Sequence, residues 1–194
     1  MNSVSGNARL SATALLRKAS QLLSDAPDNR DAACRYPVLA TVDETGGANA
    51  RTLILRAFDP ERWRVTLHTD RRSEKMREIA GCNAASLLFY DHGAAFQVRM
   101  KGTVAIEHDE TVIAGVWRNL PEGNKPNYRS AEPPGTSLEG PGDSGPDIRG
   151  IDGFENFAIL VFEPDSVDIL ALSPQANRRY RFEPALGRGC WLVP

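Results

Sequence analysis

The chain has 194 residues, in which 23 Lys and Arg accompany 25 Asp and Glu, for a formal net charge of -2 at pH 7. This length predicts one domain with a sizeable hydrophobic core. The near-neutral charge argues against a protein that binds duplex nucleic acid, because that task requires a basic excess. The longest apolar run has about six residues, far fewer than the roughly 20 that cross a bilayer, so no membrane partner is expected.

The number and spacing of the cysteines and histidines indicate the cellular compartment and exclude some kinds of catalytic site. Cys34, Cys82 and Cys190 are odd in number and widely spaced, which favours reduced thiols over a disulfide framework. The N-terminus lacks the basic region and apolar stretch of a secretory signal, so we expect a cytoplasmic protein. The histidines show neither metal-ligand spacing nor a Ser-His-Asp arrangement, so we expect no metal site and no nucleophilic hydrolase.

Periodicity along the first half predicts one helix, three strands and a second helix. Apolar residues at helical spacing over 10–23 predict an N-terminal helix, which we assign to 1–30 ahead of a domain at 31–194. Alternating residues then predict antiparallel strands from Tyr36, over 49–58 and over 63–69. Ser73 is placed to cap a short helix, with Met76, Ile79 and Ala80 facing inward and Gly81 ending it.

The second half is also rich in strands. We expect strands over 84–91 and 94–107, a helix after Asp109, and two hairpin-like strands over 157–162 and 167–172. Residues 121–153 are dense in Pro and Gly and predict a long surface loop. A basic segment at 177–182 follows. So many antiparallel strands must protect their edges, so the sequence predicts a mainly β fold, an antiparallel barrel with flanking helices.

Two arginines flank the first candidate site. Arg51 and Arg56 bracket the strand-like residues Thr52, Leu53, Ile54 and Leu55. A separation of five places them on opposite faces of a regular strand, so one ligand can meet both only across a strand end or at a bulge. The alternative is two solvated arginines on an edge strand.

The second candidate runs from a strand end into a helix start. Its hydroxyls and cations suit a phosphate, because a helix N-terminus adds unpaired N–H groups and partial positive charge. The residues are His68, Thr69, Arg71, Arg72, Ser73 and Lys75. The alternative is a capped helix with a solvated basic first turn.

Two further residues have both a binding and a structural interpretation. Gln97 projects from the side of its strand opposite the apolar row, where its amide could hydrogen-bond to the edge of a ring. The alternative is that it is simply exposed, as most such glutamines are. Trp117 could be a stacking platform, but its helical spacing favours the core.

Taken together, these segments resemble the pyridoxamine 5'-phosphate oxidase-like family of FMN-binding split barrels. The matching pieces are residues 40–43 with the glycine turn after them, Arg51 to Arg56, His68-Thr69 with Ser73 and Lys75, Phe89-Tyr90, and Gln97 to Gly102. The resemblance implies an antiparallel split β-barrel and a homodimer with FMN at the subunit interface. It implies these cofactor-binding residues: Arg51, Thr52, Leu53, Ile54, Leu55, Arg56, His68, Thr69, Arg72, Ser73, Lys75, Gln97, Arg179 and Arg181.

The chain also departs from the family pattern. Glu74 stands where the family often has an arginine, with Arg72 as a possible substitute, and Leu120 stands where the family's substrate-phosphate arginine is expected. Leu170 lies near the place of a usual tryptophan. The resemblance therefore implies an FMN-dependent oxidoreductase of unknown small-molecule substrate, with Arg56 as the catalytic residue near flavin and substrate. The alternatives are a non-catalytic flavin-binding module, a true pyridoxamine 5'-phosphate oxidase, or a β-barrel interaction domain without cofactor.

Overall fold

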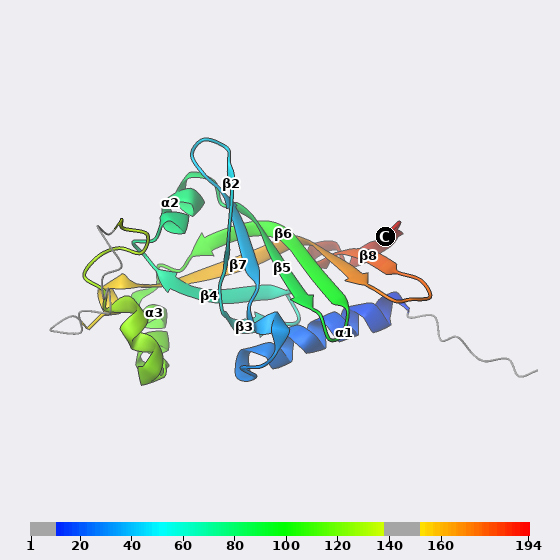
Figure 1. Ribbon diagram of the computed structural model, residues 1–194, viewed down its shortest axis with the longest axis horizontal. Coiled ribbons are helices and arrows are strands. Elements are labelled where there is room, and N and C mark those ends of the chain that lie inside the picture. Colours follow the sequence, from blue (N-terminus) through cyan, green and yellow to red (C-terminus); the bar gives the residue numbers. More distant parts are fainter. Residues whose placement is uncertain (1–10, 138–151) are drawn as a thin grey trace, which may run out of the picture.

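The computed structural model describes residues 11–137 and 152–194 and places nine strands in one sheet (Figure 1). The strands are β1 Val38–Val42, β2 Ala48–Thr52, β3 Leu55–Asp59, β4 Arg64–Asp70, β5 Ala84–Asp91, β6 Phe96–Ile106, β7 Phe157–Ala171, β8 Arg178–Glu183 and β9 Arg188–Leu192. The α-helices in these ranges are α1 Ala12–Asp25, α2 Glu74–Gly81 and α3 Glu110–Asn119. None of the helices in this part of the chain is long and apolar enough to span a membrane.

The sheet is antiparallel throughout, which confirms the mainly β fold class with flanking helices. Its order is β2-β1-β5-β6-β7-β4-β3, with β8 paired to β7 and β9 to β8. The prediction that the sheet closes completely was wrong, because β2 and β3 at the two ends of this order are not paired with each other. The chain between them leaves the ladder, and the Leu53 N–H donates instead to the Pro37 carbonyl at 2.9 Å.

Two predicted strand boundaries also need correction. The single strand expected over 49–58 is divided into β2 and β3, and the register shifts between Leu55 and Ala57, which places Arg56 at a bulge. The two strands expected over 157–162 and 167–172 are one continuous strand, β7. It passes Pro164 through a bulge opposite Gly102, where the missing Pro N–H is tolerated. The pairing of β9 with β8 was not foreseen.

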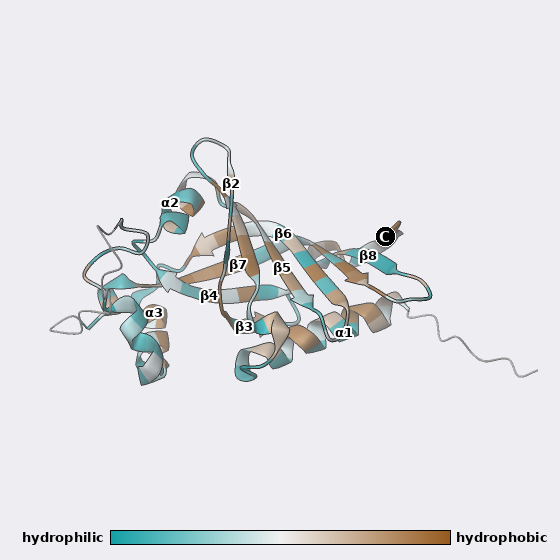
Figure 2. Ribbon diagram, in the orientation of Figure 1, coloured by the Kyte–Doolittle hydropathy of each residue, from teal (hydrophilic) through white to brown (hydrophobic). Residues whose placement is uncertain are grey.

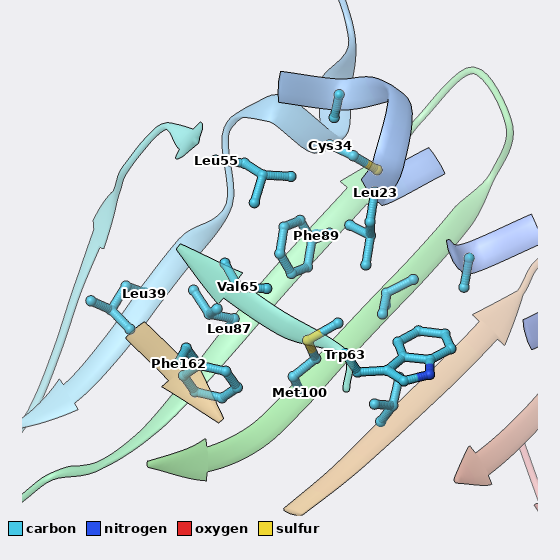
Figure 3. Packing of buried hydrophobic residues seen from close by; sticks show 14 of the residues in the cluster. Leu23, Cys34, Leu39, Leu55, Trp63, Val65, Leu87, Phe89, Met100 and Phe162 are labelled. Atoms are coloured by element: carbon cyan, nitrogen blue, oxygen red, sulfur yellow. The ribbon is translucent and has the colours of Figure 1, made fainter. Parts of the chain in front are cut away.

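The main core lies between the inward faces of the strands and α1. The N-terminal helix contributes Leu15, Ala19 and Leu23, all fully buried, and belongs to the same apolar cluster as the strands. Figure 3 shows this packing, with Phe89 and Met100 close to Val65 and Leu87. In Figure 2 teal and brown bands alternate along β5 and β6, as expected for strands with one buried face.

A second, smaller core covers the other face of the first half of β7. Trp117 of α3 packs edge-to-face against Tyr128 and tilts against Phe157, which confirms its interpretation as a core residue. Within the expected loop at 121–153, residues Glu122–Tyr128 form a 3-10 helix. Residues 138–151 of that loop lie outside the described ranges.

Gly102 of β6, which lies opposite the bulge of β7, gives a first testable prediction. A Cβ at Gly102 would overlap the backbone of Glu163 and Pro164 on β7, so Gly102→Ala forces two paired strands apart. We expect a loss of about 1–3 kcal/mol in the free energy of unfolding, the usual cost of overpacking. Urea denaturation measures it. The control is Gly115→Ala in α3, where a Cβ meets no atom within 4 Å and should stabilise the helix. Equal effects of the two substitutions would contradict the prediction.

Candidate functional site

The end of β4 and the start of α2 gather two hydroxyls around one lysine, and we call Thr69, Ser73 and Lys75 the Lys75 cluster. Lys75 Nζ donates to Ser73 Oγ at 2.9 Å and to Thr69 Oγ1 at 3.1 Å. Thr69 and Ser73 are buried, with 6% and 4% of their surface exposed. The turn between strand and helix brings the three residues together: Ser73 is the N-cap residue of α2, but its side chain makes no capping bond.

The ammonium of this cluster faces hydroxyls and a second cation. Burial lowers the pKa of Lys75, and the nearby positive charge of Arg51 lowers it further. Among the described residues, no carboxylate lies within ion-pair distance of Lys75 Nζ. Cations and hydroxyls that converge at a helix N-terminus make a donor set that fits a phosphate monoester.

Arg51 is held beside this cluster by a buried glutamate that the sequence analysis missed. Its guanidinium donates to Glu78 Oε2 at 2.9 Å and also contacts Thr41 Oγ1. Glu78 accepts further hydrogen bonds from Thr41 and from Asn49 Nδ2, the latter at 2.6 Å. Burial by itself would raise the pKa of Glu78, but these hydrogen bonds and the charge of Arg51 bring it below its ordinary value.

The helix α2 was expected to bury Met76, Ile79 and Ala80. Ala80 is exposed instead, and Glu78 is buried. A carboxylate at a helical position that faces polar strand residues is a signal that could have identified this network, but only if the pairing of β1 with β2 and the packing of α2 had been known.

Arg72 points elsewhere. Its Nε and Nη2 bind the two carboxylate oxygens of Asp70 at 3.1 and 2.7 Å, and its Nη1 donates to the Ser130 and Ala131 carbonyls. The side chain therefore ties the strand end to the segment after Tyr128, and all three of its nitrogens are engaged.

On the other side of β4, Arg56 and His68 form a second polar site. Within the described residues, Arg56 Nε and His68 Nδ1 are buried and have no hydrogen-bond partner. Burial lowers the pKa of Arg56, opposed by an interaction with the Tyr128 hydroxyl, and burial with the charge of Arg56 lowers the pKa of His68 to about 3. His68 is therefore neutral at physiological pH. Two buried nitrogens without partners, on side chains whose charges interact, indicate a place where a ligand supplies the missing partners.

The residues between the two arginines have different environments. Thr52 is exposed, Leu53 and Ile54 are half-buried outside the strands, and Leu55 is fully buried in the main core. The Leu55 side chain is committed to packing, so only its backbone is available to a ligand.

The last predicted site residues lie on the outer face of the sheet, around another buried carboxylate that the sequence analysis missed. Asp168 of β7 is 4% exposed and accepts from Arg179 Nε at 2.9 Å and from Arg99 Nη2 at 2.8 Å. Arg181 lies 3.9 Å away. We call Arg99, Asp168, Arg179 and Arg181 the Asp168 cluster. Burial opposes ionisation of Asp168, but hydrogen bonds from Arg179 and Arg99 and their charges lower its pKa.

Gln97 stands in the next row of this face. It is paired with Tyr90 on β5 and with Leu170 on β7, and Arg179 pairs with Leu170 from the far side. Its neighbours Phe96 and Val98 point inward to the core. The structure thus brings Arg51, Thr69, Ser73 and Lys75 together. It places Gln97, Arg179 and Arg181 apart from them, on the outer face of the sheet.

Comparisons with known proteins relate the chain to one protein family. Residues 17–108 match the family model described as pyridoxamine 5'-phosphate oxidase, FMN-binding domain. A pyridoxine/pyridoxamine 5'-phosphate oxidase from Rhizobium etli is 39% identical over 71 residues, which cover 37% of this chain and 34% of that protein. The chain therefore matches about a third of the length of this curated relative.

Two solved structures share the fold over nearly the whole chain. A pyridoxamine 5'-phosphate oxidase-related, FMN-binding protein from Nostoc punctiforme has a TM-score of 0.71 at 22% identity, covering 92% of this chain and 97% of that one. PhzG from Burkholderia lata, solved with tetrahydrophenazine-1-carboxylic acid, has a TM-score of 0.71 at 19% identity, covering 97% and 95%. Residues 17–108 thus match the FMN-binding domain of pyridoxamine 5'-phosphate oxidases, and the chain shares its fold with a pyridoxamine 5'-phosphate oxidase-related, FMN-binding protein.

Proposed function

We propose that this protein is an FMN-dependent oxidoreductase that acts on a small molecule. One observation carries the proposal: a half-buried lysine, which among the described residues hydrogen-bonds only to hydroxyls, lies beside Arg51. Across the same strand lie nitrogens of Arg56 and His68 that have no partner in this part of the chain. The first group suits the phosphate of FMN. The second suits a polar ring or a substrate close to it.

Each group of residues has a defined role in this proposal. Lys75, Thr69 and Ser73 bind the phosphate with Arg51, and the Glu78 network fixes where the Arg51 guanidinium points. The backbone of residues 53–55, free of strand pairing at 53 and 54, lies along the flavin. Bound FMN supplies the electron transfer, and the chain supplies binding, orientation and charge.

Arg56 is the proposed catalytic residue. The bulge at this position turns its side chain out of the regular alternation and toward His68 and Tyr128. A permanent positive charge in a half-buried place stabilises negative charge on a reduced ring or on an anionic substrate. A neutral His68 next to it can accept or donate a hydrogen bond without adding charge.

The proposed active unit is a homodimer with FMN between the two copies. Support comes from the two faces of the chain: the Lys75 cluster lies by α2, whereas Gln97 and Arg179 project from the outer face of β6 and β8. Since the two sets lie on different faces of one chain, we infer that a second copy related by a two-fold axis completes the site, with one set from each copy around a single flavin. Tyr90, paired with Gln97 and 47% exposed, provides apolar surface for such a contact.

Mixing two variants tests this shared site. Lys75→Met removes the phosphate contact and Gln97→Leu removes the proposed ring contact, so each variant alone should bind FMN weakly. In a mixed dimer, one site carries both changes and the other carries neither. We expect FMN binding to reappear when the two are unfolded together and refolded, measured by quenching of flavin fluorescence. Binding that stays at the level of the separate variants contradicts the shared site.

Turnover separates an enzyme from a flavin-binding module. A reductant such as NADPH, or an amine, should bleach the bound flavin under anaerobic conditions, and oxygen should restore its absorbance. An Arg56→Met variant should retain FMN but bleach more slowly. A flavin that no added reductant bleaches in the wild-type protein favours storage or sensing.

We expect pyridoxamine 5'-phosphate to be a poor substrate. Leu120, at the place where the family's phosphate-binding arginine is expected, is 7% exposed in the second core and offers no donor. Losing a charge-assisted hydrogen bond costs about 1.5–3 kcal/mol of binding. An oxidase assay that follows hydrogen peroxide checks this, and a micromolar KM with ordinary enzymatic turnover would contradict it.

We also assign this activity to the cytoplasm. Cys34, Cys82 and Cys190 are free thiols in the described chain, which suits a reducing compartment. Fractionation of the expressing cell tests the assignment, and recovery of the protein from an oxidising compartment would contradict it.

A further inference from the structure

A second anion-binding site on the outer face of the sheet goes beyond the proposed flavin site. A cavity of about 120 Å³ opens there beside the Asp168 cluster. It is lined by Arg99, Lys101, Ser166, Asp168 and Arg181. In Figure 1, β8 and the end of β7 that pairs with it lie on the side of the C-terminus, away from α2 and α3.

Strand register builds the cavity. Arg99, Asp168 and Arg181 stand directly opposite one another across β6, β7 and β8. One row further along, Lys101 stands opposite Ser166. Side chains in adjacent rows of one face lie close enough to meet one small ligand. Val98 and Met100, which alternate with Arg99 and Lys101 along β6, point into the core. Arg99 and Lys101 therefore lie on the outer face of the sheet, away from the Lys75 cluster.

The lining carries an excess of positive charge. Asp168 is the single carboxylate of the lining, and the N–H groups of Arg179 and Arg99 already bind both of its oxygens. Arg181 is 3.9 Å from that carboxylate, and among the described residues Lys101 forms no ion pair. Arg99 Nε is in addition buried with no hydrogen-bond partner in this part of the chain. The lining therefore combines three cations, Arg99, Lys101 and Arg181, with one carboxylate whose oxygens are already bound, a charge balance that favours a further anion.

Size selects the kind of anion. A volume of about 120 Å³ is a few times the roughly 30 Å³ that one water occupies, so the cavity holds a tetrahedral oxyanion and not a flavin ring. Arginine forks and a lysine are the donors that bind phosphate most strongly, and the Ser166 hydroxyl adds another.

We propose that Arg99, Lys101, Ser166 and Arg181 form a binding site for a phosphate-sized oxyanion, organised by Asp168. The oxyanion is free inorganic phosphate or the phosphate group of a larger ligand. The site is separate from the Lys75 cluster, so its failure in a test leaves FMN binding intact.

Inorganic phosphate is the probe, titrated calorimetrically into the FMN-loaded protein at constant ionic strength, with chloride as the balancing anion. We expect saturable binding that Lys101→Gln weakens by about tenfold to a hundredfold. Lys101 is exposed, so the variant should fold. The control Arg17→Gln removes an exposed cation of α1 and should change nothing.

A second arm repeats the titration on protein loaded with riboflavin. Phosphate binding sensitive to Lys101→Gln in both loaded forms identifies free phosphate as the ligand. Such binding in the riboflavin form alone would mean that the phosphate of FMN occupies this cavity, and it would overturn the proposal of a site separate from the Lys75 cluster. The proposal is overturned if phosphate has no effect beyond chloride, if Lys101→Gln binds phosphate as the wild type does, or if Lys101→Gln instead weakens self-association, since a carboxylate of a second copy would then fill the cavity.

Discussion

Lys75→Met should weaken FMN binding by about tenfold to a hundredfold, because one charge-assisted hydrogen bond to the phosphate is worth about 1.5–3 kcal/mol. Riboflavin, which lacks the phosphate, should bind the variant and the wild type alike. Fluorescence-quenching titrations with the two flavins measure the difference directly.

Stability separates this effect from misfolding. The ammonium of Lys75 is partly desolvated, lies near the positive charge of Arg51 and forms no ion pair with the described residues, so its replacement by methionine should not lower the melting temperature of the flavin-free protein. Arg77→Met, on an exposed position of the same helix, is the matched control and should leave both affinities unchanged. Equal losses for FMN and riboflavin would mean that Lys75 acts through folding.

Glu78→Gln should be the most destabilising polar substitution at the site. Removing one partner of a buried ion pair costs about 3–5 kcal/mol, and we expect about 2–3 kcal/mol because the Arg51 side chain keeps 21% exposure and glutamine keeps some hydrogen bonds. Urea denaturation at neutral pH measures the loss. Glu74→Gln, exposed in the first turn of α2, is the control.

The same substitution has a pH signature. The folded-state pKa of Glu78 is lowered, so its ionisation stabilises the protein above the ordinary glutamate pKa, and this contribution is lost as pH falls toward the lowered value. The stability difference between wild type and Glu78→Gln should therefore shrink in acid. A difference that stays constant from neutral pH to pH 4 would contradict the role of the charge.

Local patterns predicted most elements because each depends on neighbours in sequence. The strand over 84–91 and the helix after Asp109 follow from alternation and a cap, and both lie where expected. The break between β2 and β3 at 53–54 depends on a hydrogen bond to Pro37, and the continuity of β7 through Pro164 depends on pairing with Gly102. Both partners are distant in sequence. No local pattern contains that information.

The site divides in the same way. Thr69, Ser73 and Lys75 lie within seven residues of sequence, so their grouping could be predicted from spacing. Glu78 and Asp168 are carboxylates whose partners come from strands that are remote in sequence, and a charged residue in isolation predicts exposure. Arg56 joins His68 only because a bulge interrupts β3, an event that the sequence analysis could name as a possibility but not place.

The most direct measurement for the account is a titration of the wild-type protein with FMN and with riboflavin, combined with light scattering of the loaded species. We expect saturable FMN binding at one flavin per chain, much tighter than riboflavin binding, in a particle of two chains. A protein that leaves FMN fluorescence unchanged, or a monomer that binds FMN and riboflavin equally, would contradict it.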